Sequence, residues 1–423
     1  MEVLANAEAG ARTQIAFPEA RAMLLAAVKP LEAQRVPLLA ANGRTAAFGL
    51  RASEDIVPFA RSAMDGFALR ASETLTASRA EPLRLRVIGG TYAGDNPTSL
   101  PAHRAVTIAT GAALPAGADA VVPFEVVELG RHTITLFSPL ASGENVFAPG
   151  EDAKRGDILV RAGDVLTPGR VALLAAGGYT TVAVHRRPRI ALVSTGNEIV
   201  SPDEKPKPGQ IRNSNSAMLA AYLEHDGADV VFIEHASDTE TAVRTTLECA
   251  SRVSDLVIIT GGASAGERDL VKGVLRTLGA SFFFDSVALR PARPTGFARL
   301  GECLVAVLPG NPAAAHIAYV ALVRGIVRRF AGHSDAYRAA VPAMLDGVVE
   351  RKERHHCLSF GTFVIRGESL SVTPLVNQCS SRVRTSAEAN ALIVVEPGSG
   401  YLLAGHTVPV EVLDWNAVPI AHV

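Results

Sequence analysis

The middle of the chain alternates short runs of β-branched and aliphatic residues with longer segments whose apolar residues recur at helical spacing. Over residues 188–332 this alternation predicts a doubly wound α/β sheet, in which strands and helices follow one another in turn. Four runs are expected to form its strands: RIALVS, DVVFIEH, DLVIIT and CLVAVL. A further strand pattern is present in SFFFDSVAL.

The helical segments of this region begin after residues that suit the start of a helix. Asparagine and aspartate side chains can accept a hydrogen bond from the first free backbone amides, and proline suits the first helical position. The candidates are Asn213 or Asn215, Asp238, Asp269, and Asn311 followed by Pro312. Gly227 and Gly279 are expected to end two of the helices, because glycine tolerates the left-handed conformation found there.

The remaining parts of the chain are richer in β patterns. Residues 51–149 contain LRLRVIGG, AVTIATG and ADAVVPFE and are expected to form an inserted β-rich domain. The helical segments ARAMLLAAVKPL and RVALLAAGG flank it, so residues 12–50 and 150–187 are expected to pack together as one discontinuous linking domain. Residues 333–423 contain SLSVTPL, ALIVVEP and VPVEVL, which predict a terminal barrel or sandwich.

The predicted fold class is therefore multi-domain, α/β plus β. It combines a doubly wound α/β domain with the inserted β-rich domain and a C-terminal β-barrel-like domain.

Composition narrows the possible partners and location. The 423 residues carry a net charge of −1, which gives no general attraction for nucleic acid or a membrane surface. The four cysteines form no CxxC pair. The N-terminal segment MEVLANAEAG lacks the order of a secretion signal. The longest apolar stretch, residues 312–327, contains His316 and Arg324 and is shorter than the roughly 20 residues of a membrane span. We expect a cytoplasmic protein that binds neither nucleic acid nor membrane.

Three strands run directly into turns that contain glycine: STGNE, GGASAGERD and PGNP. The carboxyl ends of parallel strands meet at one sheet edge, where exposed amides and helix N-termini favour anions. Glu198 and Asp269 lie in two of these turns, and carboxylates beside phosphate require a bridging cation such as Mg²⁺. The alternative for Asp269 and Asp238 is helix capping. The convergence of several such loops favours a binding site.

Other residues allow further interpretations. Arg290 and Arg293 in ALRPARP are suited to an oxyanion, although exposed arginines are commonly just solvated. GASAG fits the GxSxG pattern of serine hydrolases, with Ser264 as nucleophile and Asp285 and His316 in a possible triad order. The P-loop pattern and GxGxxG after a strand are absent, which argues against nucleotide kinases and dinucleotide dehydrogenases.

Seven motifs occur in a fixed order over residues 62–312: SAMDGFALR, IATGAALPAGADAVV, GED, STGNEIV, GQIRNSNS, GGASAGERD and LPGNP. With RTSAEANALIVVEPGSGYLLAGHTVPV near the C-terminus, they resemble the molybdopterin molybdenumtransferases, the MoeA family, and the E domain of gephyrin. The resemblance implies an elongated, four-domain homodimer with its active site between subunits. It also implies that molybdenum from molybdate is inserted into adenylylated molybdopterin, with Mg²⁺ bound and AMP released. A molybdopterin adenylyltransferase and apo-molybdoenzymes are implied as possible partners.

The resemblance assigns functional residues by matching motifs. The acidic set is Asp65, Asp152, Glu198, Asp238 and Asp269, of which Glu198 and Asp269 are expected to hold Mg²⁺. Asp65 is expected to reach across from the β-rich domain and to orient or activate the reacting groups. The substrate-binding set is Thr110, Ser194, Thr195, Gly196, Asn215, Gly261, Gly262, Ser264, Gly266, Arg290, Arg293, Pro309, Gly310, Asn311 and Pro312.

The chain departs from the family pattern mainly at basic positions. Arg290 and Arg293 stand where members usually have lysines, and Ser286 and Phe147 stand where a lysine and an arginine are common. Ala314 replaces a frequent serine. An arginine fork and a lysine point charge approach an oxyanion differently. Two hypotheses follow: an active insertase, or a diverged paralogue that binds molybdopterin or the cofactor without inserting molybdenum.

Overall fold

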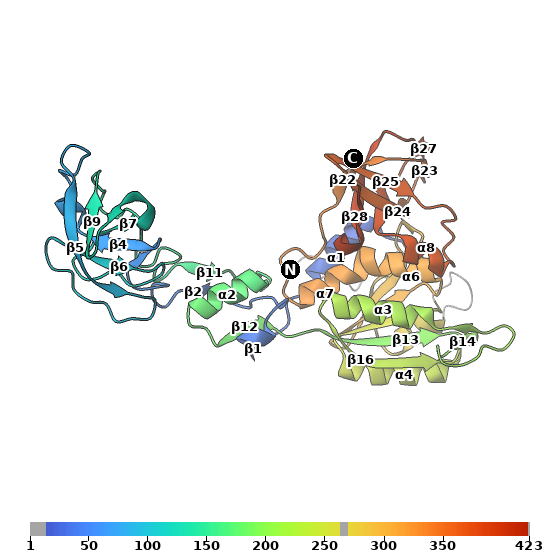
Figure 1. Cartoon of the computed structure of the whole chain (residues 1–423). Coiled ribbons are helices and arrows are strands. Elements are labelled where there is room, and N and C mark those ends of the chain that lie inside the picture. The colour runs from blue at the N-terminus through green and yellow to red at the C-terminus, as the bar shows by residue number, and fades with distance from the viewer. Residues whose placement is uncertain (1–13, 263–269, 422–423) are drawn as a thin grey trace.

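The computed structural model describes residues 14–262 and 270–421. Figure 1 shows an elongated molecule in which a β-rich unit lies at one end and the α/β sheet and a second β unit lie at the other. A slender region containing β1, β2, β11, β12 and α2 joins the two ends. The expected multi-domain α/β plus β class is confirmed.

The α/β part is built on a six-stranded sheet with the order β16-β13-β17-β21-β20-β18. The four predicted runs form its parallel portion: β13 (Arg189–Thr195), β16 (Asp229–Ala236), β17 (Leu256–Thr260) and β21 (Cys303–Leu308). β20 (Gly296–Leu300) pairs antiparallel with β21 and with β18 (Ser281–Phe284). The sheet is therefore mixed, and β20 was not among the strands predicted from the sequence.

The single strand expected in SFFFDSVAL is divided in two. β18 ends at Phe284, and β19 (Leu289–Arg290) pairs with the C-terminal β unit instead. Between them the chain leaves the sheet and pairs with Ile15: the Ile15 amide donates to the Ser286 carbonyl, and Ile15 and Val287 form an isolated parallel β-bridge. The apolar pattern continues through this break because Val287 and Leu289 are also buried.

Helices cover the sheet at the predicted places. They are α3 (Ser214–His225), α4 (Glu240–Val253), α5 (Leu270–Thr277), α6 (Pro312–Ala318) and α7 (Arg324–Phe330), with a π-helical turn (Tyr319–Val323) joining the last two. Asn213 caps α3, whereas Asn215 lies within it. The start of α4 was predicted wrongly: Thr239 is the cap, because its hydroxyl accepts from the Ala242 amide, and Asp238 lies one residue outside.

The inserted unit is a six-stranded sheet with the order β7-β4-β6-β5-β9-β8. Its strands are β4 (Gly66–Leu69), β5 (Leu83–Thr91), β6 (Arg104–Ile108), β7 (Ala120–Pro123), β8 (Glu128–Leu129) and β9 (Thr133–Leu136). The three predicted β segments of this region correspond to β5, β6 and β7. A short pair, β3 (Arg61–Ser62) with β10 (Val146–Phe147), lies where the chain enters and leaves the unit.

The linking region is formed by the two flanks of the insertion. β1 (Ala33–Pro37) pairs with β12 (Thr181–His185), and β2 (Leu50–Arg51) pairs with β11 (Ile158–Val160). α2 (Pro168–Ala176) packs in the same apolar cluster. α1 (Phe17–Ala26) instead packs against α7 and buries Leu24 in the α/β core. The flanks therefore meet through strands, while their first helix belongs to the other body.

The C-terminal unit closes into a five-stranded barrel. Its strands, in the order of pairing, are β24 (His356–Arg366), β25 (Ser369–Pro374), β22 (Val341–Leu345), β28 (Thr407–Val412) and β26 (Ala391–Val395), which pairs back with β24. α8 (Val383–Glu388) lies between the barrel and α6. Short strands complete the fold: β14 (Ile199–Val200), β15 (Ile211–Arg212), β23 (Val349–Glu350), β27 (Tyr401–Leu402) and β29 (Ile420–Ala421). Within the described ranges, every helix is too short or too polar to cross a membrane.

Candidate active-site cleft

A cleft of about 1400 Å³ opens at the carboxyl ends of β13, β17 and β21. The glycine-bearing turns that follow these strands come together there, as predicted from the parallel order of the strands. Twelve of the predicted residues line it: Ser194, Thr195, Gly196, Glu198, Asn215, Asp238, Gly261, Gly262, Pro309, Gly310, Asn311 and Pro312. Ser264, Gly266 and Asp269 lie outside the described residues. The roles of these residues remain predictions, but most of the set shares one site.

Two glycines shape the loops of the cleft. Gly261 has a φ of +93°, and a Cβ there would lie 2.6 Å from the Thr195 carbonyl oxygen. Its backbone conformation and the available space therefore both require glycine, and the close approach of the loops after β13 and β17 depends on it. Gly196 has a φ of +131°, a backbone conformation that favours glycine within the loop that carries Glu198.

Glu198 and Asp238 bring two carboxylates into the cleft. Asp238 is held by a reciprocal pair of hydrogen bonds with Asn197: the Asn197 amide donates to Asp238 Oδ2, and the Asp238 amide donates to Asn197 Oδ1, both at 3.1 Å. This pair ties the loop after β13 to the loop after β16. Sequence reasoning missed Asn197, although its position inside STGNE was a usable signal.

Asn215 presents an unused acceptor in the cleft wall. Its side chain is buried, and Nδ2 donates to the Gly310 carbonyl at 2.8 Å. Oδ1 has no hydrogen-bond donor among the described residues. A buried amide oxygen without a partner costs free energy, so a ligand N–H or O–H is its natural complement.

The barrel also contributes to the cleft through residues that sequence reasoning did not single out. Ser381 and Val383 line it. Asn311 Nδ2 donates to Ser380 Oγ at 3.2 Å, and the Ala313 amide donates to the Ser380 carbonyl at 2.9 Å. The loop before α8 thus accepts hydrogen bonds from a side-chain amide and a backbone amide at the start of α6. Its only sequence signal is the polar run CSSR.

Asp65 and Thr110 form a separate acidic module on the inserted unit. Asp65 Oδ1 accepts from the Thr110 amide at 2.7 Å and from the Thr110 hydroxyl at 3.0 Å. These two hydrogen bonds lower the pKa of Asp65, the backbone bond contributing most. Asp65 directly precedes β4, and Figure 1 places β4 and β6 at the opposite end of the molecule from β13. A single chain therefore does not bring this module to its own cleft.

The other predicted charged residues also lie away from the described cleft lining. Asp152 is exposed and lies 3.8 Å from Arg61 Nη2. Phe147, where the family pattern has arginine, has the Arg61 guanidinium 5.0 Å from its ring centroid. Arg290 and Arg293 are exposed, Arg290 at the end of β19 and Arg293 just beyond it, where β19 pairs with the barrel strand β24.

The residues of the hypothetical hydrolase triad have other partners. Ser264 lies outside the described residues. Asp285 Oδ2 accepts from Arg276 Nη2 at 2.8 Å. His316 Nε2 lies 2.5 Å from the Tyr222 hydroxyl, and burial lowers the pKa of His316 to about 3. An imidazole with so low a pKa is a poor general base at neutral pH.

The carboxylates of the cleft suit Mg²⁺ in their chemistry. Glu198 and Asp238 offer oxygen ligands, and Mg²⁺ is commonly bound by one or two carboxylates together with substrate phosphates and water. Within residues 14–262 and 270–421, no group of three acidic, histidine or cysteine side chains is close enough to hold an ion alone. The two carboxylates therefore fit a Mg²⁺ ion whose remaining coordination positions are filled by the phosphorylated ligand and water.

The fold and the cleft define a class: a multi-domain α/β protein with a glycine-lined cleft at the carboxyl edge of its sheet. Family models match residues 15–178 as "MoeA N-terminal region (domain I and II)", residues 191–329 as "Probable molybdopterin binding domain" and residues 363–413 as "MoeA C-terminal region (domain IV)". The chain belongs to the molybdopterin molybdenumtransferase (MoeA) family.

Individual relatives agree with this assignment over nearly the whole length. A molybdopterin molybdenumtransferase of Bacillus subtilis is 33% identical over 404 residues, covering 94% of each chain. One from Staphylococcus epidermidis is 30% identical over 96% of this chain and 97% of its own. A crystal structure of a molybdopterin biosynthesis MoeA protein from Pyrococcus horikoshii has a TM-score of 0.84 at 26% identity, covering 95% of this chain and 100% of that one.

Proposed function

We propose that this chain is an active molybdopterin molybdenumtransferase that inserts molybdenum from molybdate into adenylylated molybdopterin and releases AMP. The observation that carries the proposal is the meeting of three amide-rich loops with Glu198 and Asp238 in one cleft. Backbone amides suit a pyrophosphate, and the carboxylates suit its counter-cation. Twelve of the residues that match the family motifs line this cleft.

Glu198, with Asp269 beyond the described residues, is the proposed holder of Mg²⁺ at the pyrophosphate. When bound, Mg²⁺ neutralises phosphate oxygens and makes AMP a better leaving group. Asp238, fixed by Asn197, adds a third carboxylate at the same rim. Asn215 Oδ1 accepts a hydrogen bond from the substrate, because it has no donor among the described residues.

The Asp65–Thr110 module is proposed to act at the cleft of a second copy. Thr110 keeps the Asp65 carboxylate ionised, since it donates two hydrogen bonds to one oxygen. An ionised Asp65 can orient the incoming groups or accept a proton from them. The separation of the two ends in Figure 1 supports a homodimeric site in which one chain supplies Asp65 and the other the loops.

The reaction is tested by incubating the purified protein with adenylylated molybdopterin, molybdate and Mg²⁺ and measuring AMP. Asp65→Asn and Glu198→Gln are expected to lower the rate of AMP release by roughly 100-fold or more, in the range of a lost acid–base or charge-stabilising group. Glu234→Gln on the exposed edge strand β16 is the matched carboxylate control and should behave as wild type.

The rival hypothesis is a binding paralogue without turnover, motivated by the departures at Arg290, Arg293, Ser286, Phe147 and Ala314. It predicts tight binding of molybdopterin, measured by calorimetry, with no AMP released by the wild-type protein. That result would overturn the proposed activity while leaving the family assignment intact.

A further inference from the structure

The chain crosses between the linking region and the α/β body at two neighbouring points. One crossing runs from α1, which is packed on the α/β core, to β1 of the linking region through Glu32. The other runs from β12 of the linking region to β13 of the sheet through Arg186 and Arg187. The angle between the two bodies therefore depends on how these two short segments are held.

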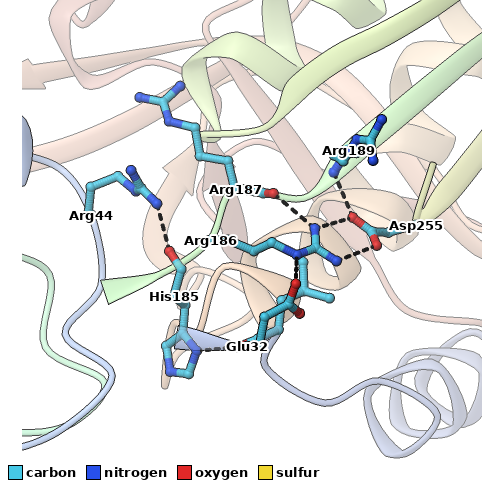
Figure 2. Close-up of polar contacts among 8 residues, drawn as sticks. Glu32, Arg44, His185, Arg186, Arg187, Arg189 and Asp255 are labelled. Carbon is cyan, nitrogen blue, oxygen red and sulfur yellow. Dashed lines mark hydrogen bonds and ion pairs between the residues drawn. The ribbon is translucent and has the colours of Figure 1, made fainter. Parts of the chain in front are cut away.

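Arg186 ties both crossings to the base of the sheet, as Figure 2 shows. Its Nη1 and Nη2 bond the two carboxylate oxygens of Asp255 at 2.6 and 2.7 Å, and its Nε bonds Glu32. Asp255 immediately precedes β17, and its Oδ2 also accepts from the Arg189 amide at 2.7 Å. One guanidinium thus contacts the first crossing, the second crossing and the central part of the sheet.

The electrostatics favour a persistent clamp. The hydrogen bonds that Arg186 donates to Asp255 raise the pKa of Arg186, and the hydrogen bond that it donates to Glu32 lowers the pKa of Glu32. The Arg186 and Asp255 side chains are 22% and 19% exposed, so solvent screens this bidentate pair less than an ordinary surface pair. Glu32 is 68% exposed and contributes less.

A close backbone contact stands beside the clamp. A Cβ on Gly332, just after α7, would lie 2.1 Å from the ring of His185, the last residue of β12. His185 Nδ1 in turn lies 2.6 Å from the Leu31 carbonyl in the first crossing. The junction is thus tightly packed on one side and held by ion pairs on the other.

We propose that Arg186 is a positioning residue for the transferase reaction: it fixes the angle at which the linking region leaves the α/β body. The inserted unit is connected to the α/β body through the linking region, so this angle sets the position of the Asp65–Thr110 module. A small rotation at the junction becomes a large displacement at the far end of the elongated molecule (Figure 1). This inference rests on the proposed role of Asp65 at a cleft.

The test combines a distance measurement with kinetics. A spin label on the exposed Cys249 of α4 and another on Arg131→Cys in the inserted unit report the distance between the bodies, in a Cys379→Ser background. Labelled chains are diluted with unlabelled chains so that distances within one chain dominate. The variants are Arg186→Gln, Arg186→Lys and the neighbouring control Arg187→Gln, whose side chain pairs with the exposed Asp229 at 3.6 Å.

Arg186→Gln is expected to broaden the distance distribution and to lower kcat roughly 10- to 100-fold, as for misplacement of a remote reacting group. The KM for adenylylated molybdopterin should stay within about threefold of the wild-type value, because the loops that line the cleft are unchanged. Arg186→Lys keeps the positive charge but loses the bidentate geometry of the guanidinium. Its distance distribution and its kcat should therefore lie between those of wild type and of Arg186→Gln. Arg187→Gln should match wild type in both measurements.

An unchanged distance distribution in Arg186→Gln, or a broadened one with unchanged kcat, would overturn the proposal. If Arg186→Gln fails to fold, Glu32→Ala removes only the link between the crossings and should give a smaller broadening and a smaller loss of kcat. If the wild-type protein releases no AMP, the proposed function fails, whereas the distance distributions still decide whether Arg186 holds the angle.

Discussion

Acid is expected to weaken the packing of the helix that forms one wall of the cleft, because His316 is buried uncharged at its centre. His316 lies on α6, with its ring 5.0 Å from Tyr222 and 5.2 Å from the barrel residue Phe360, measured between centroids. Desolvation by burial, and then the Arg324 charge, lower the pKa of His316 to about 3. The unfolded chain therefore binds this proton more readily than the folded one, and stability falls as pH drops below the unfolded pKa of roughly 6.5.

The size of the effect follows from linkage. Each unit of pKa difference corresponds to about 1.4 kcal/mol, so between pH 7.5 and pH 5 this one residue should remove roughly 2 kcal/mol from the free energy of unfolding. The loss should continue towards pH 3 and then level off, since the folded state also binds the proton there. His316→Gln removes the titration while retaining a hydrogen-bonding partner for Tyr222.

The assay is denaturant unfolding of wild type and His316→Gln at pH 7.5 and pH 5, followed by fluorescence and circular dichroism. The difference in free energy of unfolding between the two proteins should shift by about 2 kcal/mol in favour of the variant at the lower pH. Tyr222→Phe is the control, because it removes the hydrogen bond between Tyr222 and His316 but leaves the histidine to titrate. An identical difference at both pH values would refute the reasoning.

Two further predictions concern the cleft. Gly261→Ala should weaken molybdopterin binding measured by calorimetry and lower Tm, because its φ of +93° and the Thr195 carbonyl 2.6 Å from the new Cβ impose roughly 1–3 kcal/mol of strain. Gly169→Ala, in α2 with nothing within 4 Å of the new Cβ, should leave binding unchanged and keep or raise Tm; equal losses in both would contradict the explanation. Asn197→Ala should lower kcat/KM for AMP release roughly three- to tenfold, because it removes the Asn197 Oδ1 that accepts from the Asp238 backbone amide and so loosens the loop that carries the Asp238 carboxylate. Thr239→Ala should instead cost about 1 kcal/mol of stability with activity retained, because it removes only the cap of α4. If Asn197→Ala lowered stability without affecting activity and Thr239→Ala lowered activity, a capping role for Asp238 would be favoured.

The sequence determined the location of the cleft, because local apolar patterns and one rule of sheet topology are sufficient to place it. Four apolar runs became parallel strands, and turns after strands of one direction must gather at one edge. The sequence predicted either a barrel or a sandwich for the C-terminal unit, because alternating apolar patterns do not distinguish the two. Pairing of β26 back to β24 settled it.

Only the tertiary structure decided which partners the polar side chains take. Asn197 and Asp238 are 41 residues apart, and Arg186 and Asp255 are 69 apart. Hydrogen bonds over such separations leave no periodic trace in the sequence. The apolar pattern also predicted one strand where there are two, because Val287 and Leu289 are buried in the same core as Phe284 although β18 ends at Phe284.

The sequence by itself thus fixed the chemistry available to this protein: the carboxylates, the glycine turns and the family motifs that contain them. The tertiary structure decided how those groups are distributed, with one acidic module at each end of an elongated chain (Figure 1). The physical reason is that burial patterns are encoded locally, whereas the angle between two bodies depends on a few long-range contacts such as those of Arg186.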